Sequence, residues 1–113
     1  MDQNSGIKIV LNKEAVQFNL EALRREIYEI SSSVEEDTTQ MNMKYVAVRT
    51  KLCKDVEFIK ATSGVVDSED VKALYNLYSS LAIIFKLEES ALGMKIAADT
   101  ALGYIDDYLA EIK

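Results

Sequence analysis

Apolar residues recur every three or four positions along two long proline-free stretches, residues 13–62 and 68–112, with one break between them. Positions spaced in this way fall on one face of an α-helix. In the first stretch the positions are Val16, Leu20, Leu23, Ile27, Ile30, Val34, Thr38, Met41, Tyr45, Val48, Leu52, Val56 and Ile59. In the second they are Val71, Leu74, Leu77, Leu81, Ile84, Leu87, Ala91, Met94, Ala98, Leu102, Ile105, Leu109 and Ile112.

The pattern predicts an all-α fold, a long antiparallel helical hairpin that forms one domain over residues 1–113. Its parts are an extended lead-in (1–12), helix one (13–62), a turn (63–67) and helix two (68–112). At about 1.5 Å per residue, each helix would be about 70 Å long. Asn12 is the expected N-cap of helix one, and Asp67 or Ser68 that of helix two. Gly64 is expected to end helix one in the left-handed conformation.

A second apolar set lies beside the main line of helix two, at Tyr75, Tyr78, Phe85, Leu92 and Ile96. One hairpin partner cannot cover both sets, so the chain is expected to be half of a helical bundle completed by another protein. Gly93 and Ala97 belong to a cluster of small residues that would permit close approach of another backbone. The alternative for that cluster is a thin hairpin whose own first helix lies close there.

The weakest part of helix one is Ser31–Gln40, where serine, threonine and aspartate compete for backbone hydrogen bonds. A loop at residues 31–39 is therefore the main structural alternative. It would give a three-helix and more compact domain.

Composition argues against several functions. The chain has a net charge of −6 and no histidine, so a nucleic-acid surface and a helical di-iron site are not expected. Its one cysteine, Cys53, has no histidine to activate it and reads as a small apolar residue. No phosphate-binding loop, zinc spacing or nucleophile motif is present, so neither an enzyme nor a bound cofactor is expected. The chain also lacks the pattern of a signal peptide or a membrane span.

Several segments together resemble the small helical-hairpin partners of bacterial type VII secretion, the WXG-like (Esx-like) proteins, and above all those encoded beside LXG toxins. The segments are the lead-in Ile7–Leu11, the helix opening at Ala15-Val16 with Leu20-x-x-Leu23, the central break, and Leu74-x-x-Leu77-Tyr78-x-x-Leu81. The Trp-x-Gly turn is missing, since the break reads Ser63-Gly64-Val65. The Tyr-x-x-x-Asp/Glu export motif is not matched at Tyr104 or Tyr108.

The resemblance implies a targeting or chaperone-like partner without enzymatic activity. It would bind the helical N-terminal domain of an LXG toxin, with a second small helical protein, and be exported with it from the bacterial cytoplasm without a cleaved signal peptide. The residues expected at the interface are Tyr78, Phe85, Leu92, Gly93, Ile96 and Ala97. The alternative hypothesis is a self-associating acidic bundle, such as a homodimer, that regulates or inhibits another protein.

Overall fold

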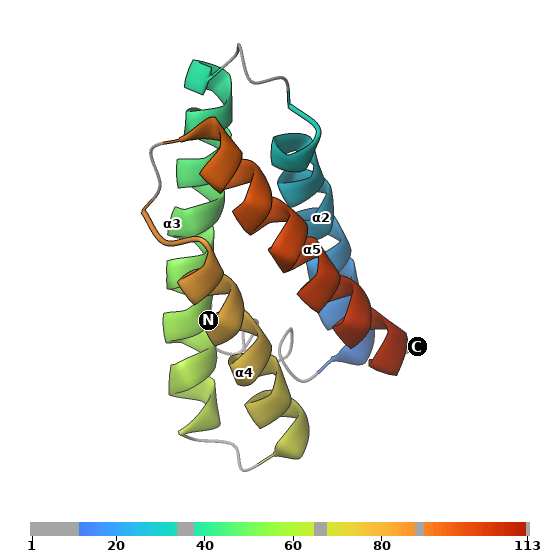
Figure 1. Ribbon diagram of the computed structural model, residues 1–113. Helices are drawn as coiled ribbons and strands as arrows, with labels where there is room; N and C mark the ends of the chain where they lie inside the picture. The colour runs from blue at the N-terminus through green and yellow to red at the C-terminus, as the bar shows by residue number, and fades with distance from the viewer. Residues whose placement is uncertain (1–11, 34–37, 65–67, 88–89, 113) are drawn as a thin grey trace.

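A computed structural model describes residues 12–33, 38–64, 68–87 and 90–112, and these residues form helices joined by short connections (Figure 1). The helices are α2 (Lys13–Ser31), α3 (Thr38–Ser63), α4 (Glu69–Ile84) and α5 (Ala91–Ile112). The all-α prediction is confirmed for this part of the chain. The lead-in through Leu11 lies outside the described residues.

The four helices alternate in direction, so that each runs antiparallel to the one before it (Figure 1). α2 packs mainly against α5, and α3 packs mainly against α4. α5 crosses the bundle obliquely, from the start of α3 to the start of α2, and contacts α3 as well (Figure 1). The molecule measures 45 × 27 × 20 Å, so it is far shorter than the predicted hairpin.

One hydrophobic core runs between the helices, and most of the predicted periodic positions contribute to it. Among the largest side chains with no more than 2% exposure are Tyr45, Phe85, Leu20, Leu23, Ile27, Ile30, Met41, Leu52, Leu81, Met94, Ile105 and Val71. The periodicity therefore identified the core side of each helix. It failed at Thr38, which is exposed at the start of α3, and at Leu87, which is 76% exposed and follows the end of α4.

The predicted helix starts are confirmed at two positions. The side chain of Asn12 accepts hydrogen bonds from the backbone N–H groups of Glu14 (2.9 Å) and Ala15 (3.1 Å). Ser68 caps α4 and accepts from the N–H of Val71 at 3.5 Å, whereas Asp67 lies outside the described residues. The prediction for Gly64 is wrong, because no described glycine has a positive φ.

The prediction of one continuous helix over residues 13–62 is also wrong, because α2 ends at Ser31. The hydroxyl groups of the next two serines turn back to the helix. Ser32 donates to the carbonyl oxygen of Tyr28 (2.9 Å), and Ser33 donates to that of Glu29 (2.6 Å). The break falls in the segment that helix propensity marked as weak, and α3 returns antiparallel to α2.

The prediction of one helix over residues 68–112 is wrong, although the apolar periodicity continues through the break. α4 ends at Ile84, and α5 begins at Ala91. Phe85 leaves the helical path with φ −87° and ψ 44°, and its side chain is fully buried. Burial of this ring reverses the direction of the chain. As a result, α5 covers apolar residues that the predicted helix two was expected to leave for another protein to cover.

Candidate protein-binding surface

An open apolar groove lies where the end of α4 meets the first half of α5, and we call it the α4–α5 groove. Its volume is about 410 Å³. It is lined by Tyr45, Ile83, Ile84, Lys86, Gly93, Ile96, Ala97 and Thr100. Ile83 and Ile96 are 74% and 56% exposed, so two large apolar side chains at the groove are in contact with water.

The shape of the groove depends on the connection between α4 and α5. The rings of Tyr45 and Phe85 are stacked, with centroids 4.8 Å apart and an angle of 23° between their planes. The hydroxyl group of Tyr45 donates a hydrogen bond of 2.5 Å to the backbone carbonyl oxygen of Lys86. One side chain of α3 therefore fixes both the ring that ends α4 and the backbone that follows it.

The start of α5 is held by Ser90. Its hydroxyl oxygen accepts a hydrogen bond from the N–H of Gly93 (2.9 Å), and its carbonyl oxygen accepts from the N–H of Met94 (3.0 Å). This is the geometry of an N-cap. Ser90 is therefore a sequence signal for the start of a second helix, which the continuous apolar periodicity concealed.

The structure separates the six residues that were expected to bind a partner. Tyr78 and Phe85 are 5% and 0% exposed and belong to the core of this chain, so they are not available on its surface. Gly93, Ile96 and Ala97 line the α4–α5 groove together. Leu92 follows the start of the same helix and is 61% exposed. Binding by these four residues stays a prediction.

Tyr78 and Tyr108 lie in related electrostatic surroundings. Burial raises the pKa of Tyr78, and the negative charge of Asp55 raises it further. Burial also raises the pKa of Tyr108, to which Asp70 and Glu111 add. Both phenols therefore stay neutral at physiological pH.

The outer face of α5 continues the exposed surface beyond the groove. We use this name for Leu92, Ile96, Thr100, Gly103 and Asp107, which follow one another at steps of three or four residues and are all exposed. The hydroxyl of Thr100 donates to the carbonyl oxygen of Ile96 at 2.8 Å, so it is satisfied within the helix. The face consequently needs no polar partner between Leu92 and Gly103.

Gly103 has no structural role that the described residues show. It lies inside a helix, its φ is not positive, and a Cβ atom built on it would meet nothing within 4 Å. Glycine costs about 1 kcal/mol relative to alanine inside a helix. No contact among the described residues requires a glycine at this position.

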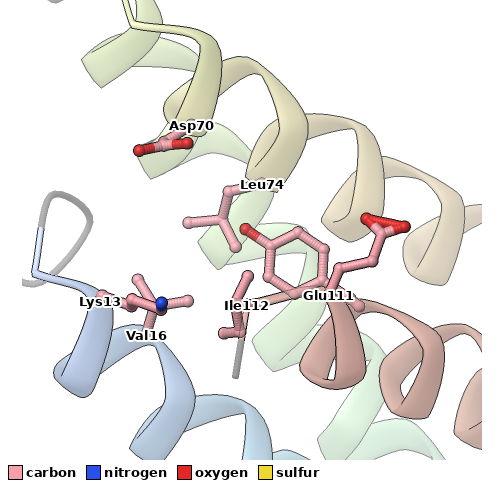
Figure 2. A pocket seen from close by; sticks show the side chains of 7 residues that line it. Lys13, Val16, Asp70, Leu74, Glu111 and Ile112 are labelled. Carbon is pink, nitrogen blue, oxygen red and sulfur yellow. The ribbon is translucent and has the colours of Figure 1, made fainter.

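A second hollow, of about 260 Å³, lies at the other end of α5 (Figure 2). Its lining comes from the start of α2, the start of α4 and the end of α5: Lys13, Val16, Asp70, Leu74, Tyr108, Glu111 and Ile112. Figure 2 shows the apolar side chains of Val16, Leu74 and Ile112 between the three helices. The ammonium group of Lys13 and the carboxylates of Asp70 and Glu111 line the hollow together with these apolar side chains.

Cys53 lies exposed on α3 rather than packed, so its interpretation as a small apolar residue is wrong. Within the described residues, no three or more histidine, cysteine or acidic side chains are grouped to hold a metal ion. None of the described helices is long and apolar enough to cross a membrane.

Comparisons with models of protein families, with curated proteins and with solved structures found no match for this chain.

Proposed function

We propose that the chain is a protein-binding module without enzymatic activity, and that the α4–α5 groove and the outer face of α5 receive a helix of its partner. The observation that carries this proposal is the apolar groove beside Ile83 and Ile96, which are both more than half exposed. Grooves of this kind bind amphipathic helices through apolar side chains spaced at one helical turn.

The charge distribution supports the choice of this surface. α4 carries no charged residue from Ala73 to Ile84, although the chain as a whole has a net charge of −6. An interface core is generally depleted of charged residues and rich in apolar ones. The surface around the α4–α5 groove has this composition.

For the partner, we propose the helical N-terminal domain of an LXG toxin, as the resemblance to WXG-like proteins implies. The chain would then act as a targeting factor that covers apolar helix surface of the toxin before export from the cytoplasm. Its contribution would be packing and not chemistry. Leu92 and Ile96 would be the main apolar contacts, with Gly93 and Ala97 allowing the partner helix to approach.

A self-contained regulator is the second candidate, and one observation favours it. Because Tyr78 and Phe85 are buried within the chain, the bundle has a core of its own and needs no partner to complete it. Such a regulator would use its acidic surface to bind a basic protein. Binding of that kind weakens steeply with salt, whereas apolar packing does not.

The two candidates are separated by co-purification of the tagged full chain from its source cells at 0.1 M and 1 M NaCl. Helix binding in the groove predicts that a partner with a long helical N-terminal domain stays bound at both salt concentrations. It also predicts that the partner is lost from Ile96→Asp but kept by Val46→Asp, a matched change at an exposed site on α3. Equal retention by both variants would contradict the proposed surface, and loss at 1 M NaCl alone would favour the acidic regulator.

A further inference from the structure

We infer that Tyr45 is the positioning residue of the α4–α5 groove: from α3, it holds the connection between α4 and α5 and so determines how far apart the two walls of the groove lie. This inference rests on the proposed function, because it assigns to Tyr45 control of the affinity of that groove for a partner helix. Tyr45 is only 2% exposed, so its effect on binding comes through the walls rather than through contact area of its own.

The two walls of the groove belong to different helices. The end of α4, with Lys86 just after it, forms one wall, and the first half of α5 forms the other. Their separation is therefore not fixed by the geometry of a single helix, but by the connection between Ile84 and Ala91. α3 contacts both α4 and α5, and Tyr45 is the residue of α3 that lines the groove.

Tyr45 contacts two consecutive residues of this connection. Its ring stacks on Phe85, the residue that ends α4, with 4.8 Å between the ring centroids. Its hydroxyl group donates a hydrogen bond of 2.5 Å to the carbonyl oxygen of Lys86. The stack fixes the ring of Phe85, and the hydrogen bond fixes the backbone that leads away from α4. The α4 wall is thereby tied to α3.

The α5 wall is held by other contacts. Ser31, at the end of α2, donates a hydrogen bond to Asp99 on α5. Ser90 accepts a hydrogen bond from the N–H of Gly93 and defines where α5 begins, but this contact is local to the start of the helix. One wall is thus held from α2 and the other from α3. Tyr45 joins the second of them to the floor that both walls share.

The hydroxyl group of Tyr45 determines how often the groove has the geometry that a partner helix needs. Without it, the carbonyl oxygen of Lys86 loses this hydrogen bond, and the connection gains conformations in which the walls lie differently. Apparent affinity falls in proportion to the fraction of molecules in the binding-competent state. The net free energy of one such hydrogen bond corresponds to a change of about two- to tenfold. By reciprocity, a bound helix should stabilise the hydrogen bond by the same factor.

A purely structural role of Tyr45 leads to a different expectation, because any change that lowers the stability of the bundle equally would then weaken the groove equally. Asn12→Ala provides this comparison. It removes the two hydrogen bonds that cap α2, and the loss of such a cap costs about as much stability as the loss of one hydroxyl hydrogen bond. Asn12 directly precedes Lys13, which lines the hollow at the opposite end of α5 from the groove.

The first test is methyl NMR and hydrogen exchange of the purified full chain, for the wild type, Tyr45→Phe and Asn12→Ala. Because Tyr45→Phe keeps the aromatic ring, a shift of the methyl resonances of Ile84 and Ile96 reports movement of the walls. These resonances should shift in Tyr45→Phe, and the N–H of Gly93 should exchange about two- to tenfold faster. Asn12→Ala should change neither. Unchanged methyl resonances in Tyr45→Phe, or equal changes in both variants, would overturn the inference.

The second test measures binding, in the same co-purification at 1 M NaCl. Tyr45→Phe should retain about two- to tenfold less of the partner than the wild type, whereas Asn12→Ala should retain the same amount. Loss of the partner from Ile96→Asp, together with equal retention by Tyr45→Phe and Asn12→Ala, would contradict the role of Tyr45 and leave the proposed function standing. Retention by Ile96→Asp would instead contradict the proposed function, and the methyl resonances would then decide whether Tyr45 positions the groove.

Discussion

The two halves of the chain were predicted to be alike, one long helix each, but they differ in what interrupts the helix and in what covers the surface. In the first half, α2 and α3 are separated at serines that bond back to the helix, and charged residues make up seven of 19 and seven of 26 positions. In the second half, the break depends on the buried ring of Phe85, and α4 is uncharged from Ala73 to Ile84.

The difference shows in the hollows and ion pairs of the two surfaces. The hollow between α2 and α3 is lined by Glu26, Glu29, Lys44, Ala47, Val48 and Lys51. Lys44 and Glu29 form an ion pair of 3.5 Å across these helices. The α4–α5 groove has one charged residue, Lys86, in its lining. Water therefore solvates the charged lining of the α2–α3 hollow well, whereas it solvates the mostly apolar lining of the α4–α5 groove poorly.

The largest effect is expected from the residue that ends α4. Phe85→Ala should lower the free energy of unfolding by about 3–5 kcal/mol, because it leaves a cavity and removes the stack on Tyr45. Urea denaturation measures the loss. Leu87→Ala, two residues away and 76% exposed, is the control and should change stability by no more than about 0.5 kcal/mol. Equal effects of the two changes would show that Phe85 does not hold the second break.

The next prediction concerns pH. The folded chain keeps Tyr78 neutral because its pKa is raised, whereas a tyrosine in the unfolded chain ionises near pH 10. The unfolded state therefore loses this proton first, and stability should fall as the pH rises above about 10, by up to roughly 1.4 kcal/mol for each pH unit. Tyr78→Phe should reduce this slope in urea titrations from pH 8 to 11, and Tyr108, whose pKa is also raised, should account for part of the slope that remains. An unchanged slope would mean that the hydroxyl of Tyr78 is not protected from ionisation.

A smaller effect is expected when only the hydroxyl group of Tyr45 is removed. Tyr45→Phe keeps the ring stack but deletes the hydrogen bond to Lys86, which should cost about 0.5–1.5 kcal/mol. Tyr104→Phe, at a residue that is 49% exposed, should have no measurable effect. Hydrogen exchange should also become faster at the start of α5 in Tyr45→Phe. Unchanged exchange there would show that the hydroxyl group of Tyr45 does not hold the start of α5 in place.

The smallest effect is expected in the charged half. Arg24 donates from Nε to Asp106 at 2.6 Å, which ties α2 to α5, but both side chains are more than 40% exposed. Arg24→Gln should therefore cost only about 0–1 kcal/mol, and the cost should disappear at 1 M NaCl. Arg25→Gln, on the same helix and exposed, is the control. A larger loss that salt does not reduce would show that this pair is structural.

Sequence periodicity predicted the helical class and the core side of each helix, and residue types predicted caps at Asn12 and at Asp67 or Ser68, because these features depend on nearby residues. The first break could be foreseen as an alternative, since Ser31–Ser33 are poor helix formers. The second could not be read from periodicity, because the apolar spacing continues through Ile84 and Leu87. It depends on a contact between Phe85 and Tyr45, which are 40 positions apart in the chain.

The same contact explains which candidate binding residues were misplaced. Tyr78 and Phe85 have the composition of interface anchors, and only the antiparallel return of α5 shows that the chain buries them itself. Leu92 and Ile96 have similar apolar character, but their positions on α5 point away from the core. Composition alone does not separate the two pairs.

Small-angle X-ray scattering of the purified full chain, extrapolated to zero concentration, tests the central claim most directly. The four-helix arrangement predicts a radius of gyration near the 14.4 Å of the Cα atoms. A rod about 70 Å long, as in an unbroken hairpin, would give roughly 20 Å. A value near 15 Å would support two breaks and a bundle with its own core, and a value near 20 Å would contradict them.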